Sequence, residues 1–180
     1  FAETLSKPVL LLPVYEAAAA KSLWDNPNPW KEALAQQVLS HGLVPITLPG
    51  DDLRDIGIIG AEQAVDGDKM RIDAIGHRYE VDTVMVGHAT LSAGAGGRPA
   101  LQVKVVTHGP DRRAGILALS VAQKQGEEIK DLIQRSARLT IAEIEDHWKE
   151  DNLIQFEQDS VLAVVFPIRS LSEWVETKRR

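Results

Sequence analysis

The stretch "VLLLPV", residues 9–14, is apolar at every position. Successive side chains of a strand point to opposite faces of its sheet, so a strand with one wet face alternates apolar and polar residues. A run that is apolar at its odd-numbered and at its even-numbered positions therefore predicts a central strand that is covered on both faces. Such strands are typical of α/β domains, and the rest of the sheet is expected to be built around this one.

The chain downstream predicts a helix and a return to the sheet. Residues 15–27 are interpreted as a long loop. Asn28 can cap a helix and Pro29 suits its first position, where no N–H is needed. Gly42 fits the left-handed position after the last turn. The apolar residues on one face of this helix are Trp30, Ala33, Leu34 and Val38. Residues 43–48 then form a second, short strand.

A second helix and a third strand follow. Residues 51–67 are rich in Asp and Gly and are interpreted as loop with a helical turn. Asp68 can cap a helix whose apolar positions have helical spacing. These positions are Ile72, Ile75 and Tyr79. Residues 81–91 form a third strand. The alternation of strands and helices predicts two right-handed crossovers and a parallel centre.

The pattern changes after residue 91. A glycine-rich turn at 92–99 separates the third strand from two segments, 101–105 and 117–121, in which apolar residues occupy every second position. This alternation predicts an antiparallel meander with one buried face. A long helix follows from about residue 127 to residue 149. The predicted fold class is α/β, with a mixed sheet of five or six strands, a parallel centre, an antiparallel meander, and helices packed on the sheet.

The end of the chain predicts one more strand and a helix start. Residues 161–168 are continuously apolar, and Ser170-Leu171-Ser172-Glu173 has the pattern of a capping box. The helix that it opens has little length before Arg180. We therefore expect a single α/β domain over residues 1–168, with residues 169–180 starting a C-terminal helix or a second domain.

Composition narrows the possible partners. The 180 residues carry a net charge of −6, which disfavours binding to nucleic acid or anionic lipid. The chain has no cysteine, which excludes disulfides and thiolate metal sites and is compatible with the periplasm and with the cytosol. The longest apolar runs have the length of strands, so no membrane span is expected.

An acidic turn, Gly50-Asp51-Asp52, follows the second predicted strand. Ligands of open α/β sheets bind beyond the carboxyl ends of parallel strands, and carboxylates there can hold Mg²⁺. The residues that could form such a ligand or partner surface are Tyr15, Glu16, Trp24, Asp25, Asp51 and Asp52. Asp and Gly after proline are also what a turn requires. The turn interpretation is favoured, and no catalytic, cofactor-binding or metal-binding residue is assigned.

Three other features favour structural roles. The glycines at 94–97 precede a strand rather than a helix, which is typical of a hairpin and not of a phosphate-binding loop. The five histidines lack metal-ligand spacing. His88 points to the same face of its strand as Val84 and Val86, so it is expected to be partly buried and hydrogen-bonded. Trp30 is interpreted as a core residue, whereas Trp24 could either fix its loop or contact a peptide.

The segments "KPVLLLPVYE", "LWDNPNPWKEAL" and "HGLVPITLPGDDLRD" resemble an uncharacterised bacterial family, domain of unknown function twenty-sixty-six. Its pattern includes an Arg-Tyr-x-x-Asp segment, here Arg78 to Asp82, and the final "PIRSLSEWVETKRR" resembles the passage into a C-terminal part. Asp51-Asp52 departs from the single acid of the pattern. The order of elements also resembles the amino-terminal domain of TolB. That second resemblance implies an exported binding module, although fold alone does not fix function.

Three functional hypotheses follow. The leading one is a non-enzymatic, periplasmic or envelope-associated module that binds another envelope protein without a cofactor. The alternative is a Mg²⁺-dependent or nucleotide-using enzyme, cytosolic or exported, with an acidic crevice. The residues of that crevice would be Glu16, Asp25, Asp51, Asp52 and Asp55. The third is a structural domain that supports a C-terminal part.

Overall fold

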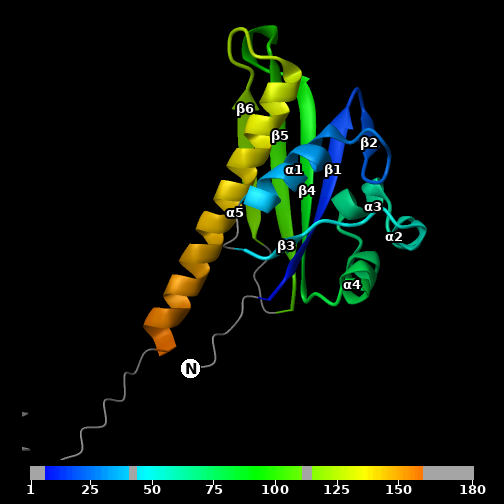
Figure 1. Ribbon diagram of the computed structural model, residues 1–180, viewed down its shortest axis with the longest axis vertical. Helices are drawn as coiled ribbons and strands as arrows, with labels where there is room; N and C mark the ends of the chain where they lie inside the picture. The colour runs from blue at the N-terminus through cyan, green and yellow to red at the C-terminus, as the bar shows by residue number, and fades with distance from the viewer. Residues whose placement is uncertain (1–6, 41–43, 111–114, 160–180) are drawn as a thin grey trace, which may run out of the picture. The chain divides into compact units, whose positions relative to one another are not determined.

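The computed structural model describes residues 7–40, 44–110 and 115–159 (Figure 1). Its sheet contains the strands β1 (Val9–Ala17), β2 (Ala20–Ser22), β3 (Ile46–Thr47), β4 (Thr83–Ala93), β5 (Pro99–His108) and β6 (Ile116–Ala122). The strand order is β2-β1-β4-β5-β6, and β3 also pairs with β1. β1 is parallel to β3 and β4, and the other pairings are antiparallel. The predicted mixed sheet, with its parallel centre and its meander, is confirmed.

The described helices are α1 (Pro29–Ser40), α2 (Leu53–Ile58), α3 (Ala61–Asp66), α4 (Lys69–Arg78) and α5 (Ile129–Asp159), with a 3-10 turn, η1 (Ala95–Gly97). The two predicted N-caps are confirmed. The side chain of Asn28 accepts a hydrogen bond from the amide of Lys31 at 3.0 Å, and that of Asp68 accepts one from Arg71 at 3.3 Å. Each cap satisfies an amide that has no partner within its own helix.

Two loop predictions were wrong. Residues 15–27 do not form one long loop, because β1 continues to Ala17 and turns back into β2. The turn places Ala18 and Ala19 at positive φ, 52° and 62°. Glycine and asparagine usually occupy such positions, so the sequence carries no turn signal here. Residues 51–67 form two short helices, α2 and α3, rather than one helical turn.

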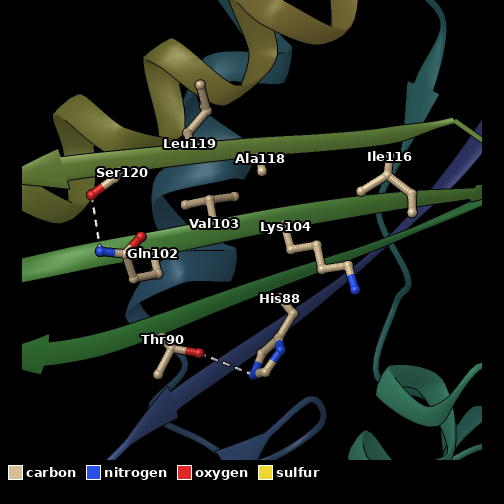
Figure 2. A pocket seen from close by; sticks show the side chains of 9 residues that line it. All are labelled: His88, Thr90, Gln102, Val103, Lys104, Ile116, Ala118, Leu119 and Ser120. Atoms are coloured by element: carbon tan, nitrogen blue, oxygen red, sulfur yellow. Dashed lines mark hydrogen bonds between the residues drawn. The ribbon is translucent and has the colours of Figure 1, made fainter.

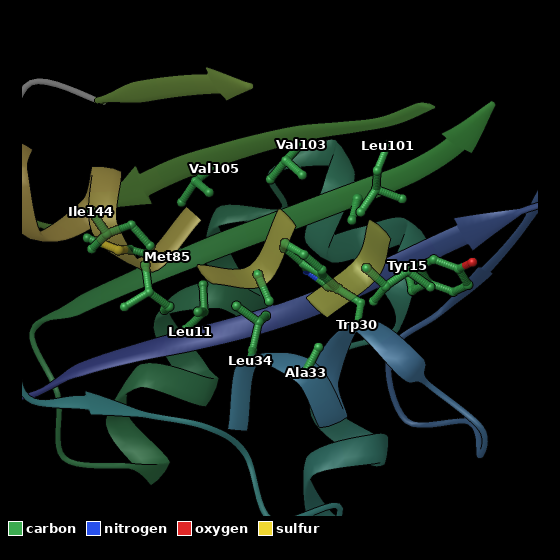
Figure 3. Close-up of a cluster of buried hydrophobic side chains, with 14 of the residues drawn as sticks. Leu11, Tyr15, Trp30, Ala33, Leu34, Met85, Leu101, Val103, Val105 and Ile144 are labelled. Atoms are coloured by element: carbon green, nitrogen blue, oxygen red, sulfur yellow. The ribbon is translucent and has the colours of Figure 1, made fainter. Parts of the chain in front are cut away.

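One face of the sheet packs against α1 and α5 (Figure 3). Trp30 and Leu34 of α1 are fully buried against Leu11 of β1, and Ile141 and Ile144 of α5 complete the layer. These residues lie at helical spacing on their helices and at alternate positions on the strands, as predicted. The first face therefore has a continuous apolar core.

The opposite face packs against the segment that contains α2, α3 and α4. Its core joins Leu10 and Leu12 of β1 and Val84 of β4 to Ile72 and Ile75 of α4. The connection from β1 to β3 passes over the first face, and the connection from β3 back to β4 passes over the second. Since the two connections run in opposite directions over opposite faces, they share one hand, as the crossover rule requires.

This second cover is incomplete. Val84 and Val86 are buried beneath it, and Val106 and His108 of β5 are partly buried. Other residues of β5 and β6 on the same face, among them Lys104 and Ser120, are exposed. Residues at alternate positions of β5, such as Val103 and Val105, are buried on the first face. The meander thus has the one buried face that its sequence predicts.

The chain divides into two compact units, Phe1–Trp148 and Lys149–Arg180. The described part of the second unit is the end of α5. The predicted helix stop at Gly42, the strand at 161–168 and the boundary at 168–169 lie outside the described residues. Within the described part of the chain, no helix has the length and apolar character that a membrane crossing needs.

Candidate functional site: the open sheet face

The uncovered half of the second face is the candidate site, and we call it the open sheet face. Its residues are Glu16, His88, Thr90, Gln102, Lys104, Ile116, Ala118 and Ser120. They lie at paired or alternate positions of four neighbouring strands, so their side chains project to the same side of the sheet. Figure 2 shows all of them except Glu16. Part of the face forms a depression with a volume of about 380 Å³, lined by residues of β4, β5 and β6.

Glu16, near the carboxyl end of β1, and His88, in the middle of the parallel strand β4, form an ion pair or a hydrogen bond. Glu16 is opposite Thr90 in the register, and His88 is opposite Val14. His88 Nε2 lies 2.7 Å from a carboxylate oxygen of Glu16 and 3.2 Å from the hydroxyl of Thr90. The side chains of Glu16 and His88 are 19% and 20% exposed. The prediction that His88 is partly buried and hydrogen-bonded is confirmed.

The geometry at His88 differs from that of a catalytic triad. An ionised carboxylate only accepts hydrogen bonds, so the contact with Glu16 requires a proton on Nε2. In a triad, the carboxylate and the hydroxyl nucleophile contact different ring nitrogens, which allows the second nitrogen to act as a base. Here Glu16 and Thr90 contact the same nitrogen. With Nε2 bearing its proton toward Glu16, this nitrogen cannot activate the hydroxyl of Thr90.

The rest of the open sheet face presents hydrogen-bonding and small side chains. Lys104 lies between His88 and Ala118 in the register, and Gln102 lies between Thr90 and Ser120. The amide of Gln102 donates to the hydroxyl of Ser120 at 2.9 Å. Ile116 adds an apolar side chain that is 62% exposed. This surface is suited to contact a large partner through several weak groups.

The acidic turn is held by basic side chains. Asp51 pairs with Lys31 of α1. Asp52 caps α2 by accepting from the amide of Arg54 at 2.8 Å, and it pairs with Arg78 at 2.6 Å. The hydrogen bond from the Arg54 amide, followed by the charge of Arg78, lowers the pKa of Asp52. Asp51 and Asp52 therefore fix the start of α2 against α1 and α4.

Asp55 continues this network into the core. Its side chain is fully buried, and it binds the guanidinium of Arg78 and the hydroxyl of Tyr79, the latter at 2.6 Å. The same hydroxyl accepts from the amide of Gly50 at 2.9 Å. Burial and then the hydrogen bond to Asp55 raise the pKa of Tyr79. Tyr79 is the C-cap of α4 and is also partly buried against the same core as Ile72 and Ile75, as its helical spacing predicts, and it joins the turn to this helix.

The other predicted candidates occupy separate places. Tyr15 lies in the core of the first face, where burial raises the pKa of its hydroxyl. Trp24 donates from its indole to the carbonyl of Ile59 at 2.6 Å, so it fixes its loop, and Asp25 is exposed. Of the six candidates, Glu16 alone belongs to the open sheet face. Among the described residues, no three histidine or carboxylate side chains lie together as ligands for a metal ion.

Gln102, Lys104 and Ser120 were not predicted as site residues from the sequence. The sequence does show that they face water, because they are the polar residues that alternate with apolar ones in the two strands of the meander. Polar residues at every second position show that one face of a strand is exposed to solvent, but they do not show that a neighbouring segment covers only half of the sheet face. The missing information was the extent of the segment that contains α2, α3 and α4.

Comparison with known proteins finds similarity at the level of structure. The sequence matches no protein-family model and no curated protein. The fold is similar to that of the hypothetical protein CT253 from Chlamydia trachomatis, with 12% identity and a TM-score of 0.52 over 78% of this chain and 97% of that chain. A variant of PelC from Paraburkholderia phytofirmans, solved as a dodecamer, aligns with 8% identity and a TM-score of 0.43 over 72% of this chain and 81% of that chain. The resemblances to the bacterial family and to the TolB domain stay predictions.

Proposed function

We propose that the chain is a non-enzymatic protein-binding module of the cell envelope and that its partner docks on the open sheet face. The observation that carries the proposal is the unequal cover of the two sheet faces. The first face is buried by α1 and α5, whereas the cover of the second face leaves β6 and part of β5 exposed. The antiparallel part of a sheet commonly keeps one face in water, and here that face continues from the covered part of the sheet and is a surface that a partner can contact.

The proposal is of a binding module rather than an enzyme because of how the histidine of the open sheet face and the carboxylates of the acidic turn are bonded. The histidine of the open sheet face holds its carboxylate and hydroxyl partners on one nitrogen. The carboxylates of the acidic turn are engaged by Lys31 and Arg78. Binding needs none of these groups to change its protonation state, whereas acid–base or nucleophilic catalysis does.

The envelope location rests on the resemblance of the sequence to an uncharacterised bacterial family and to the TolB amino-terminal domain. The lack of cysteine is compatible with this location and equally with the cytosol. The resemblance therefore supports the proposal of an envelope protein as the partner.

The chemistry of the open sheet face defines the partner further. Lys104 is exposed at the centre of the face and favours a carboxylate across the interface. Gln102, Ser120 and Thr90 lie side by side across three strands and offer hydrogen-bond donors and acceptors. Ile116 provides the apolar contact. We expect a protein surface with an acidic side chain placed beside apolar residues.

The test begins with a photo-crosslinking amino acid placed at Gln102 in envelope extracts, and the captured protein is then purified. Its affinity is measured for the wild type and for two variants with the same charge change. Lys104→Glu lies on the open sheet face, and Arg138→Glu is an exposed position of α5, whose inner side packs on the other face. We expect Lys104→Glu to weaken binding about tenfold or more and Arg138→Glu to leave it unchanged.

Two results would overturn the proposal. Equal affinities for the wild type and Lys104→Glu would move the interface away from the open sheet face. Turnover of phosphoesters, peptides or nucleotides by the purified chain in a broad substrate screen would replace a binding role with an enzymatic one.

A further inference from the structure

The two edges of the sheet are built differently. On the outer side of β1, β2 and β3 pair with only three and two residues. β2 also carries Lys21, which binds Glu62 at 3.1 Å. Very short strands and a lysine are devices that prevent the pairing of one sheet edge with another chain. This edge is therefore protected.

The other edge, β6, lacks such protection. Its seven residues, "ILALSVA", contain no charge and no proline. β6 pairs with β5 without a bulge from Ile116 to Ala122. No strand of the described part of the chain lies on its outer side. A long, regular and apolar edge is the type of strand that recruits another one.

The backbone of β6 shows which groups need a partner. The amide of Thr107 donates to Gly115, and the amide of Gln123 donates to Pro99. In an antiparallel ladder every second residue bonds to the neighbouring strand, so the odd-numbered residues of β6 are bonded to β5. The even-numbered residues direct their N–H and C=O groups outward. They are Ile116, Ala118, Ser120 and Ala122, and of their groups the carbonyl of Ala122 already accepts from Arg135 of its own chain at 2.7 Å.

We infer that β6 pairs with β6 of a second copy of this chain, in an antiparallel arrangement around a two-fold axis at Leu119. In this register Ala118 is opposite Ser120 of the other copy, and Ile116 is opposite Ala122. All four outward-directed residues then meet outward-directed residues. Antiparallel pairing at these positions forms about six hydrogen bonds between the two copies, because the carbonyl of Ala122 is already bonded to Arg135 in each copy.

The side chains fit the same register. Leu117 and Leu119 are only half buried, because β6 is the last described strand. Around the axis, Leu119 is opposite Leu119 of the other copy, and Leu117 is opposite Val121 of the other copy. These side chains all lie on the face that α5 covers. The pairing therefore extends the apolar core of each copy. On the other side, Ile116 meets Ala122 and Ala118 meets Ser120, so no two like charges are brought together.

A second copy fits this edge better than an unrelated strand for two reasons. The edge is self-complementary in hydrogen bonding and in side-chain polarity, which an isologous two-fold interface requires. The interface also closes, because within the described residues both outer edges of the resulting sheet are the protected ones at β2 and β3. The product is a dimer rather than a fibre, with the two open sheet faces continuous on one side. This inference does not depend on the proposed partner protein.

The test measures the mass of the full chain in solution over a wide range of concentration. Sedimentation and light scattering should give twice the 19.8 kDa of one chain at high concentration. Amide exchange should be slower in the dimer at Ala118, Ser120 and Ala122. The adjacent amides that already bond to β5 serve as the internal reference.

Two double variants separate this edge from other surfaces. Ala118→Glu with Ser120→Glu places like charges opposite each other across the axis, and we expect a monomer. Ala118→Glu with Ser120→Lys places opposite charges there, and we expect the dimer to persist. In both variants the glutamate at 118 lies opposite Lys104 of its own chain, so its effect within the monomer is matched. Thermal unfolding checks that both variants fold.

The masses of the wild type and of the two double variants decide whether β6 forms the dimer interface and in which register. A wild type that stays monomeric at every concentration overturns the inference, as does a dimer that persists in the variant with two glutamates. Loss of the dimer in both double variants, with unchanged thermal unfolding, overturns the register centred on Leu119. Loss in the first variant alone, with slowed exchange at the amides of Ala118, Ser120 and Ala122 in the wild type, supports both the edge and the register.

Discussion

Both carboxylate oxygens of Glu127 accept a hydrogen bond from the guanidinium of Arg135, each at 2.8 Å. The amide of Lys124 donates to the same carboxylate at 2.8 Å. Arg135 also donates to the carbonyl of Ala122, the last residue of β6. This arrangement fixes the turn between β6 and α5. The hydrogen bonds from Arg135, followed by that from Lys124, lower the pKa of Glu127 to about 2.

The first prediction concerns the stability of this turn at acid pH. A carboxyl group whose pKa is lower in the folded state stabilises that state above its ordinary pKa, here 4.5, and loses the contribution as the pH falls toward 2. Glu127→Gln should lower the melting temperature at neutral pH and should flatten its decline across this window. Calorimetry at a series of pH values measures both effects.

The neighbouring Glu128 supplies the control, because its side chain is exposed. Glu128→Gln should keep the melting temperature and the pH dependence of the wild type. A Glu127→Gln curve that runs parallel to the wild-type curve between pH 4.5 and about 2 would show that the pairing with Arg135 does not contribute.

The second prediction concerns the buried carboxylate of Asp55. Arg78→Ala removes the cation beside a fully buried acid and leaves it with the hydroxyl of Tyr79. An uncompensated buried charge is costly, and we expect a loss of about 3 kcal/mol in the free energy of unfolding. Lys69→Ala removes an exposed pair with Asp73 and should cost about 0.5 kcal/mol or less. Urea unfolding of both variants makes the comparison. Similar losses for the two would contradict the structural role of the acidic turn.

The sequence predicted the sheet better than it predicted the site. The doubly apolar strand at residues 9–14 and the alternation at 101–105 each reflect burial directly, and both were confirmed. The hairpin between β1 and β2 was missed because its turn uses two alanines, Ala18 and Ala19. Hydrophobic pattern reports how a residue is buried, whereas turn geometry depends on strain that the rest of the fold can support.

The acidic turn shows why the candidate site was harder to predict. Asp51 and Asp52 follow a strand, and in sequence they have the character of metal ligands. Their partners, Lys31 and Arg78, lie 20 and 26 residues away. The identity of such distant partners follows from packing, which a local pattern does not contain. Glu16 was placed at the correct end of the sheet because the carboxyl ends of parallel strands share one edge.

The third prediction compares one change at two glycines in helices. Gly57 of α2 has no heavy atom within 4 Å of the position that a Cβ would take. Gly57→Ala should stabilise the fold by about 0.5–1 kcal/mol, because alanine loses less backbone freedom in a helix. At Gly76 of α4, a Cβ would lie 3.1 Å from Val84 Cγ2 and 3.3 Å from the carbonyl of Val81. Gly76→Ala should therefore destabilise by about 1 kcal/mol despite the same helical gain. Chemical unfolding gives both signs, and equal shifts would contradict the close packing of α4 on β4.

The last prediction uses two hydroxyl groups on the buried side of α5. Ser136 and Thr140 are 0% and 1% exposed, one helical turn apart. The hydroxyl of Thr140 donates to the carbonyl of Ser136 at 2.8 Å, whereas the hydroxyl of Ser136 has no hydrogen-bond partner among the described residues. A buried polar group without a partner costs free energy, and alanine favours a helix more than serine does. Ser136→Ala should raise the free energy of unfolding by about 1 kcal/mol. Thr140→Ala should lower it by about 1–2 kcal/mol, because it removes a satisfied hydroxyl together with a packed methyl group. Urea unfolding of the two variants tests the pair, and a Ser136→Ala variant that is less stable than the wild type would show that this hydroxyl does have a partner.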